Sequence, residues 1–404
     1  MTQILEAWLE NRHTGQFVFE PDAPVKFRYD ADAPDTPISL SLPRNARVPR
    51  NAAGRFLENL LPDSVRMRSR LAQAYDIKDA STYSLLAKAG GDLAGGLLLL
   101  PEGKSPQIDK PFLNPILDRD LADRINSIKV DADAWLAPKS PARFSLAGTQ
   151  GKFAMANIDG DWYWSNESVP STHIVKPGAP RLEGIEQAEI AALRLASRVG
   201  LDAVSAQLLR VEDQQAFLVE RFDRERRKDS TLKARLHAED LAQAMGYGPE
   251  HKYNITVEQS FEKLSGADDQ GLLGRAFLDQ VIFNTLIGNA DAHAKNYSVL
   301  LRPDQVTLAP LYDTVPVAMY SEYEQNLAMR IAGARQSQAV SLSHWRKLAR
   351  RLALDPDELT SRVTDIATAV GELNTRAWSE LPEKQAVLLT TLVSRNVDKA
   401  LSVR

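Results

Sequence analysis

One segment constrains this chain more than any other: an apolar run at 277–287 leads straight into the polar loop 289–296. The run predicts a buried helix. Residues 297–301 and 306–309 then show strand patterns joined by a turn at 302–305. Because a hairpin of this length returns the chain to its starting edge, we expect Asp291 and Asn296 to lie within a few ångströms of Asp313.

Phosphoryl transfer requires such a set of side chains. One carboxylate, here Asp291, must orient and deprotonate the attacking hydroxyl, while an amide oxygen and a second carboxylate hold Mg²⁺ against the nucleotide phosphates. Asn296 and Asp313 are the candidates for that metal. The alternative is a polar loop that only caps a helix and a turn. That alternative does not explain Asp, His, Lys and Asn within six positions after a buried helix.

Composition excludes several classes of protein. The 404 residues include no cysteine, so disulfides and thiolate zinc sites are excluded. The net charge of -4 gives no overall bias toward nucleic acid. No apolar run approaches the roughly 20 residues of a membrane span, and the first ten residues carry acids but no basic residue. We therefore expect a cytoplasmic protein with no signal peptide and no membrane partner.

The order of patterns predicts an α+β protein in three parts. Residues 1–104 form an N-terminal α+β subdomain, 105–220 a small β-rich lobe, and 221–404 a mainly helical lobe that carries the loop. Prolines and glycines between 101 and 115 mark the first boundary. Expected helices are 55–74 with a break at 62–64, 83–88 and 186–199, and expected strands are 16–20, 25–29, 95–101, 206–210 and 216–220.

Three further segments suit a nucleotide cleft. Lys176 ends a β-branched strand, where it can neutralise phosphates, and Glu189 on the next helix can pair with it. The alternative is an exposed lysine on an edge strand. The small-residue turn within 144–153 can present backbone N–H groups to phosphate or be a plain hairpin turn. Residues 218–222 join the two lobes, where they either meet adenine or only pack between lobes.

Two segments are basic. Residues 221–235 hold seven Lys and Arg against three acids, which favours a solvated hairpin over a contact with a phosphate backbone. In the helix pattern at 343–351, Arg346 lies four residues before Arg350 and Lys347 four before Arg351. This spacing gives a basic helix edge, and such an edge is more often a solvated face than a nucleic-acid contact.

As a set, these segments resemble the HipA family of bacterial serine/threonine kinase toxins, in family order and over nearly the whole chain. One position departs from the family pattern, because Gly151 stands where the glycine-rich loop usually has Glu. The matching segments are Gly90–Gly95, Ser145–Lys152, Ser171–Lys176, Val219–Arg224, Arg235–Asp240, Asn289–Asn296 and Leu311–Asp313.

The resemblance implies a two-lobed, protein-kinase-like α+β fold related to phosphoinositide kinases, with ATP and Mg²⁺ bound. It makes Asp291 the catalytic base and Asn296 and Asp313 the Mg²⁺ ligands. It also places His293 and Lys295 close to the γ-phosphate as further catalytic groups.

The resemblance further implies that Lys176 binds the nucleotide phosphates and serves catalysis. Ser145 matches the serine that such kinases phosphorylate on themselves. Glu220 and Phe222 would present the backbone of the lobe junction to adenine. The remaining residues expected to contact the nucleotide are Ala147, Gly148, Thr149, Gln150, Lys152 and Tyr312.

By the same resemblance, the chain would be the toxin of a toxin–antitoxin module. Its partners would be a small helix-turn-helix antitoxin, operator DNA reached through that complex, and an aminoacyl-tRNA synthetase as substrate, glutamyl-tRNA synthetase by family analogy. Two alternatives stay open. One is a catalytically inactive corepressor that binds an antitoxin and operator DNA, and the other is a small-molecule kinase of similar fold.

Overall fold

The computed structural model describes residues 2–9, 11–108, 110–134, 146–148, 150–268 and 270–403. The chain forms two compact units, each assembled from segments that are separated in sequence. The first unit holds Met1–Gly178, Leu208–His251 and Ser298–Thr307, and the second holds Ala179–Gln207, Lys252–Tyr297 and Leu308–Arg404. The three-part division drawn from the sequence stays a prediction.

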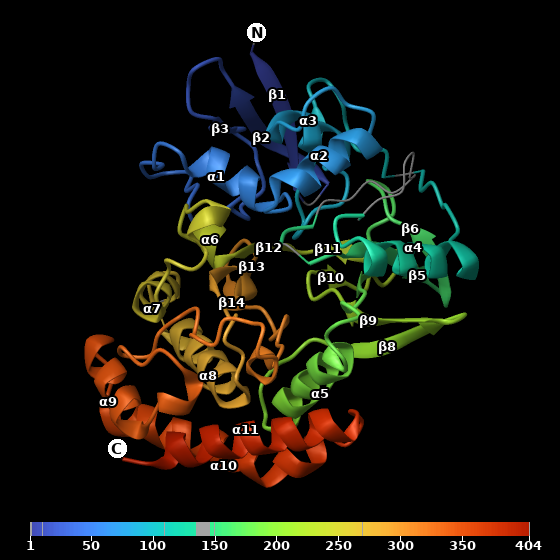
Figure 1. The fold of residues 1–404 in the computed structure, drawn as a ribbon. Helices are drawn as coiled ribbons and strands as arrows, with labels where there is room; N and C mark the ends of the chain where they lie inside the picture. The colour runs from blue at the N-terminus through green and yellow to red at the C-terminus, as the bar shows by residue number, and fades with distance from the viewer. Residues whose placement is uncertain are drawn as a thin grey trace. The chain divides into compact units, whose positions relative to one another are not determined.

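The first unit begins with an antiparallel sheet, in which the strands lie in the order β3-β2-β1-β4. Three short helices follow β3 and lie beside this sheet in Figure 1. The bounds are β1 (Gln3–Leu9), β2 (Arg12–Phe19), β3 (Lys26–Tyr29), α1 (Ala52–Asn59), α2 (Val65–Ala74), α3 (Thr82–Ala89) and β4 (Leu98–Pro101).

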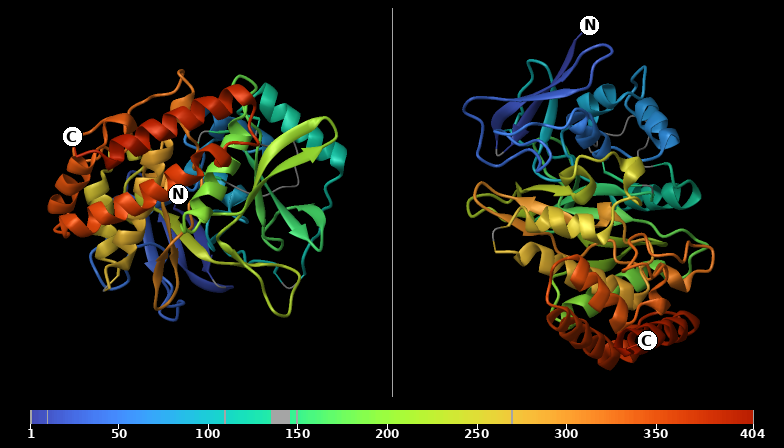
Figure 2. Two further views of the ribbon diagram at one scale, coloured as in Figure 1. Left: turned by 90° about the horizontal axis from the view of Figure 1, so that it is seen from below. Right: turned by 90° about the vertical axis from the view of Figure 1, so that its left-hand side faces the viewer.

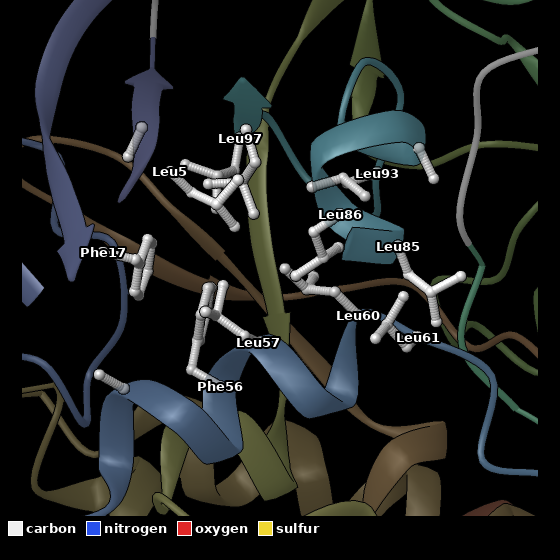
Figure 3. Packing of buried hydrophobic residues seen from close by; sticks show 14 of the residues in the cluster. Leu5, Phe17, Phe56, Leu57, Leu60, Leu61, Leu85, Leu86, Leu93 and Leu97 are labelled. Atoms are coloured by element: carbon white, nitrogen blue, oxygen red, sulfur yellow. The ribbon is translucent and has the colours of Figure 1, made fainter. Parts of the chain in front are cut away.

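Alternation along the strands builds the core of this region. Leu5 and Phe17 are fully buried and point toward Phe56 and Leu57 of α1 (Figure 3). The rings of Phe17 and Phe56 are parallel within 5°, with centroids 6.1 Å apart. Because successive strand side chains face opposite sides of a sheet, one face of β1 and β2 is buried against the helices.

A second sheet in the same unit carries Lys176. Its strands lie in the order β6-β5-β7-β9-β8, and β7 pairs antiparallel with both β5 and β9. Phe153, Met155, Val175 and Leu218 fill its core. The bounds are α4 (Asp118–Val130), β5 (Phe153–Ile158), β6 (Asp161–Trp164), β7 (His173–Lys176), β8 (Ala206–Val211) and β9 (Gln214–Glu220).

Short elements complete the first unit. Strand β12 pairs antiparallel with β13, with His237 opposite Leu301 and Asp240 opposite Ser298. The pairing joins the middle of the chain to the strand that directly follows the polar loop. The bounds are β10 (Arg224–Glu225), β11 (Ala234–Arg235), β12 (His237–Asp240), α6 (Leu241–Ala244), η1 (Pro249–His251), β13 (Ser298–Leu301) and β14 (Val306–Leu308).

The second unit is helical around α8. The long helices α10 and α11 run side by side and both pack against α8 (Figure 2). No helix in the described ranges has the length and apolarity that a bilayer crossing needs. The bounds are α5 (Ile185–Arg198), α7 (Val257–Ser265), α8 (Leu272–Ile287), η2 (Ala294–Asn296), η3 (Val317–Met319), η4 (Ser337–Ala339), α9 (Leu342–Arg351), α10 (Pro356–Ala377) and α11 (Glu383–Leu401).

Candidate phosphoryl-transfer site

The polar loop starts where α8 is forced to stop. Gly288 follows the helix in the left-handed region at φ 76°, and its N–H donates back to Thr285 O. A Cβ at this position would lie 2.7 Å from Leu392 Cδ2 and 3.1 Å from Ala318 Cβ. Glycine therefore serves both the turn and the close approach of two other segments, and the chain leaves α8 at a fixed angle.

Hydrogen bonds then hold the loop in one conformation. Asn289 Nδ2 donates to Asn284 Oδ1 at 2.8 Å and also approaches the main-chain oxygen of Asp313 at 3.4 Å. The N–H of His293 donates to Asp291 O at 2.7 Å, and the N–H of Asn296 donates to His293 O at 2.9 Å. Such a tethered loop can hold its side chains in place without a ligand.

Asp291 is only partly exposed, and a tyrosine outside the loop contacts it. Burial raises the pKa of its carboxyl, Asp313 raises this pKa further, and both the hydrogen bond from Tyr253 and the charge of Lys252 oppose the increase. The Tyr253 hydroxyl donates to Asp291 Oδ1 at 2.8 Å. Neither Lys252 nor Tyr253 was among the candidates from sequence, because both precede Asp291 by nearly forty residues.

His293 lies buried beside the same two residues. Burial lowers the pKa of its imidazole to about 4, and the positive charge of Lys252 lowers it further. Its ring therefore stays neutral at pH 7. Its Nδ1 is buried and accepts or donates no hydrogen bond among the residues that the structure describes. A buried imidazole nitrogen without a hydrogen-bond partner in the protein can form a hydrogen bond to a bound ligand.

The structure brings Asp291, Asn296 and Asp313 together in the second unit. Asn296 Nδ2 donates to the main-chain oxygen of Asp291 at 3.3 Å, which directs the amide oxygen the other way. Asp313 influences the pKa of both Asp291 and His293. It adopts φ 52°, a left-handed conformation that Asp tolerates better than most residues. Asp291 thus contacts Asn296 and lies near enough to Asp313 for the two carboxylates to affect each other, and the roles expected for the three residues stay predictions.

Contacts of Lys295 and Tyr312 also hold this arrangement in place. The Tyr312 hydroxyl donates to Lys295 O at 2.8 Å, and Leu311 forms a parallel bridge with Ala203 that fixes the chain just before Asp313. Within the described ranges, no group of three or more His, Cys, Asp and Glu is arranged to hold a metal. Amide and carboxylate oxygens are ligands that hard cations accept, so Asn296 and Asp313 are the side chains here that could hold one.

The first unit holds the other candidates. Lys176, at the end of β7, is 7% exposed, and its Nζ lies 5.3 Å from the centroid of the Phe217 ring. It is therefore a buried cation rather than the exposed edge lysine of the alternative interpretation. Glu220 ends β9 and forms an ion pair with Lys233, and Phe222 follows in a turn. Glu189 lies in the second unit, so its pairing with Lys176 stays a prediction.

The glycine-rich turn is partly described. Lys152 Nζ donates to Ala147 O at 2.9 Å, and Gly148, at φ 102°, has its carbonyl oxygen bound by the N–H of Asp63 at 3.2 Å. Gln150 is partly exposed beside it. Ser145 and Thr149 lie outside the described residues. Side-chain and backbone contacts thus brace the turn on both sides of Gly148.

Gly151, where the family usually has Glu, has a packing reason in this chain. A Cβ there would lie 2.5 Å from Ile128 Cγ2 and 2.7 Å from the carbonyl oxygen of Ala132. Both distances are below any real Cβ contact, so the end of α4 occupies the space that a side chain needs. The departure from the family pattern is therefore coupled to how α4 packs on the turn.

The prediction of a solvated hairpin at 221–235 is wrong for three of its five arginines. Arg221 and Arg224 are buried, the side chain of Arg235 is 9% exposed, and the three surround two buried carboxylates, Asp92 and Asp223. Residues between these arginines, at 225–229, are exposed as expected. The burial follows because Asp92, about 130 residues earlier in the chain, supplies the counter-charge, and no local pattern links it to this segment.

The basic edge of α9 is partly neutralised. Arg346 pairs with Asp357 at 2.9 Å, and Arg351 pairs with Glu258 at 2.9 Å. Lys347 and Arg350 show no ion pair among the described residues. Surface pairs of this kind contribute little to stability, but they halve the positive charge available to a phosphate backbone.

The protein has an α+β, two-lobed, kinase-like fold, and its candidate site consists of a buried helix, a tethered Asp–His–Asn loop and a second carboxylate. Comparison with known proteins confirms this fold class. Residues 144–373 match the model of the HipA-like C-terminal domain, and residues 5–100 match that of the HipA N-terminal domain. The chain belongs to the HipA family.

Individual relatives agree with this assignment. A protein named putative kinase Y4mE, from Sinorhizobium fredii, is 32% identical over 94% of this chain and 92% of its own length. The serine/threonine-protein kinase toxin HipA of Shewanella oneidensis is 26% identical over 91% of this chain and 88% of its own. A solved complex of HipA, HipB and operator DNA from that organism superposes with a TM-score of 0.82, at 25% identity, over 98% of this chain and 96% of that one.

Proposed function

We propose that this chain is an ATP- and Mg²⁺-dependent serine/threonine-protein kinase that acts as the toxin of a toxin–antitoxin module. The main observation behind the proposal is the tethered loop that holds Asp291, His293 and Asn296. Asp313, which follows β14, affects the pKa of both Asp291 and His293. Membership of the HipA family supports the same conclusion, and so do the names of the two relatives described above, which are both called kinases.

Asp291 has the properties of the base in such a reaction. A carboxylate that is largely buried, with a raised pKa, can accept a proton from an acceptor hydroxyl. The hydroxyl oxygen forms a bond to the γ-phosphorus of ATP, the bond from that phosphorus to the β–γ bridging oxygen breaks, and ADP leaves. The neutral ring of His293 and the ammonium of Lys295 lie on the same loop, where they would contact the transferred group.

Asn296 and Asp313 fit a hard divalent cation. Both offer oxygen atoms, and Mg²⁺ in such sites is bound through one or two protein carboxylates together with substrate phosphates and water. The orientation of the Asn296 amide, which donates its N–H toward Asp291, leaves the oxygen to serve as a ligand. When bound, Mg²⁺ would supply positive charge that offsets the charge on the phosphates.

For the nucleotide, the proposal assigns Lys176 to the phosphates and the turn at 147–152 to their oxygens. Burial of Lys176 supports this role, because a buried cation attracts an anionic ligand more strongly than a solvated one. The other residues that the proposal assigns to the nucleotide are Ala147, Gly148, Thr149, Gln150, Lys152, Glu220, Phe222, His293, Lys295, Asn296 and Tyr312.

The biological partners are proposed by analogy. The Shewanella oneidensis relative is named a toxin, and the solved complex contains HipB and operator DNA. For this chain we therefore propose a small helix-turn-helix antitoxin, operator DNA through that complex, and an aminoacyl-tRNA synthetase as substrate, with autophosphorylation at Ser145. Mass spectrometry after incubation with MgATP tests Ser145 directly.

Labelled ATP and a soluble bacterial lysate test the kinase proposal. The wild type should label a lysate protein, and Asp291→Asn should lower the rate by ~10³-fold, which corresponds to roughly 4 kcal/mol of transition-state stabilisation. Asp304→Asn, in the exposed turn of the nearby hairpin, is the matched control and should keep the full rate. Antitoxin binding without any ATP turnover would instead indicate an inactive corepressor, and ATP turnover without a labelled protein a small-molecule kinase.

A further inference from the structure

Tyr253 has no role in the function described so far, although its side chain makes the hydrogen bond to the Asp291 carboxylate. We propose that Tyr253 is a positioning residue that fixes the orientation of the Asp291 carboxylate. In that orientation Oδ2 of Asp291 can accept the proton of the acceptor hydroxyl. This inference rests on the proposed function, because it assigns to Tyr253 a part in the reaction for which Asp291 is the base. Both residues belong to the second unit.

The first argument is the geometry of the hydrogen bond. The phenol donates to Oδ1 of Asp291 at 2.8 Å, and no hydrogen bond to Oδ2 is found among the residues that the structure describes. The carboxylate thus has one oxygen engaged and one available. A phenol is a neutral donor, so it orients the carboxylate without supplying the full positive charge that would make it a poorer proton acceptor.

The second argument is that Tyr253 is itself held. Its ring meets the imidazole of His293 edge to face, with centroids 5.0 Å apart and planes at 83°. Lys252 Nζ lies 5.2 Å from the centroid of the same ring, and the main-chain oxygen of Lys252 accepts from the N–H of Ala294 at 3.3 Å. The segment is thus attached to the loop at His293 and Ala294, directly after Asp291, in addition to the hydrogen bond to Asp291 itself.

The third argument concerns access. Tyr253 is 53% exposed, while Lys252 beside it is 8% exposed. Tyr253 therefore lies at the surface, where an acceptor side chain from another protein can approach the neighbouring carboxylate of Asp291, which is itself partly exposed. A general base must lie roughly 2.6–3.2 Å from the atom whose proton it takes, and misplacement by about 1 Å can cost ~10²-fold in rate. A carboxylate free to rotate would lose that alignment.

The opposite interpretation is that the phenol blocks the base by occupying the place of a substrate hydroxyl. The two interpretations predict opposite changes when only the hydroxyl is removed. Tyr253→Phe keeps the ring against His293 and under Lys252 and removes the donor to Asp291. If Tyr253 positions the base, the rate falls. If Tyr253 blocks it, the rate rises.

The experiment measures phosphate transfer from labelled ATP to the lysate protein that the wild type labels. Tyr253→Phe should lower kcat by ~10-fold and leave KM for ATP and the melting temperature within error of the wild type. Tyr247→Phe is the matched control, since its ring packs on His251 instead of His293, and it should keep the wild-type kcat.

A double-variant cycle separates positioning from a structural effect. Because Tyr253 acts through Asp291, adding Tyr253→Phe to Asp291→Asn should cause no further loss. A kcat for Tyr253→Phe equal to or above wild type, with Asp291→Asn inactive, would overturn this inference and leave the proposed function intact. Full additivity of the two losses would also overturn it. Undiminished transfer by Asp291→Asn would instead defeat the proposed function.

Discussion

Replacing Asp92 by Asn should strongly destabilise the first unit. Asp92 is 0% exposed, and its carboxylate accepts from Arg224 Nη2 at 2.9 Å and from the N–H of Ser171 at 3.3 Å. Arg235 and Arg221 lie 3.7 and 4.0 Å away. Asparagine keeps the size of the side chain, removes its charge and points an N–H donor toward guanidinium groups that are donors themselves.

The expected loss follows from the charges in this cluster. Three guanidinium groups face two carboxylates, Asp92 and Asp223, so Asp92→Asn leaves three buried positive charges against one negative charge. Removing one partner of a buried ion pair costs roughly 3–5 kcal/mol, because the other partner stays buried without compensation. For a unit of this size, such a loss lowers the melting temperature by roughly 6–20 °C.

The pH dependence gives a second measurement. Burial alone would raise the pKa of Asp92 and Asp223, but the neighbouring arginines outweigh it and hold both below the usual range, Asp223 at about 2. A lowered folded-state pKa contributes stability that is present above the unfolded value, roughly 3.9, and is lost as pH falls through the folded value. The stability difference between wild type and Asp92→Asn should therefore shrink below about pH 4.

Thermal unfolding followed by tryptophan fluorescence, with and without acid, tests both statements. Asp161→Asn is the control, because Asp161 is an exposed residue at the start of β6 with no ion pair among the described residues. A melting temperature for Asp92→Asn within 2 °C of wild type at pH 7, by the conversion used above, would refute the argument that this cluster is a buried, mutually compensated set.

Three shorter predictions concern other positions. Asp313→Asn is chosen because Asn tolerates the φ of 52°. It should abolish the increase in melting temperature that MgATP causes and leave the melting temperature without nucleotide unchanged. An identical increase in both proteins would make Asp313 structural. Gly151→Ala should destabilise by roughly 1–3 kcal/mol through overpacking, measured by urea unfolding, and Ile128→Ala should recover part of that loss. If α9 contacts operator DNA, removing the charges of Lys347 and Arg350 should reduce the salt dependence of complex–DNA affinity by about two phosphate contacts; an unchanged slope would assign them to solvent.

The sequence predicted the parts of the site that are close along the chain. The apolar run at 277–287 became the end of α8, and the strand patterns around 302–305 became β13 and β14. Local pattern predicted these elements because a helix, a turn and a short hairpin are each recognisable from neighbouring residues. The same reasoning located β7 and α5 within two residues of their ends. The bridge between Leu311 and Ala203, which also fixes the chain before Asp313, was not predictable in this way.

Contacts between distant segments could not be predicted in this way. Tyr253 meets Asp291 only through the packing of two segments 38 residues apart, and nothing in the spacing indicates it. Arginines at 221–235 were expected in solvent because Arg is rarely buried unless it is paired. Their partner Asp92 is 132 residues before Arg224, so the pairing becomes visible only in three dimensions.

That long separation has a consequence for how the protein is made. A ribosome adding roughly 5–20 residues per second needs about 7–26 s to pass from Asp92 to Arg224, since 132 residues separate them. Until then the nascent chain carries a carboxylate whose buried position is not yet electrically balanced, and the paired strands β12 and β13 are not yet synthesised. The N-terminal region therefore completes its folding only late in translation. A chain released by a stop codon before Arg224 should be degraded rather than accumulate as a stable fragment.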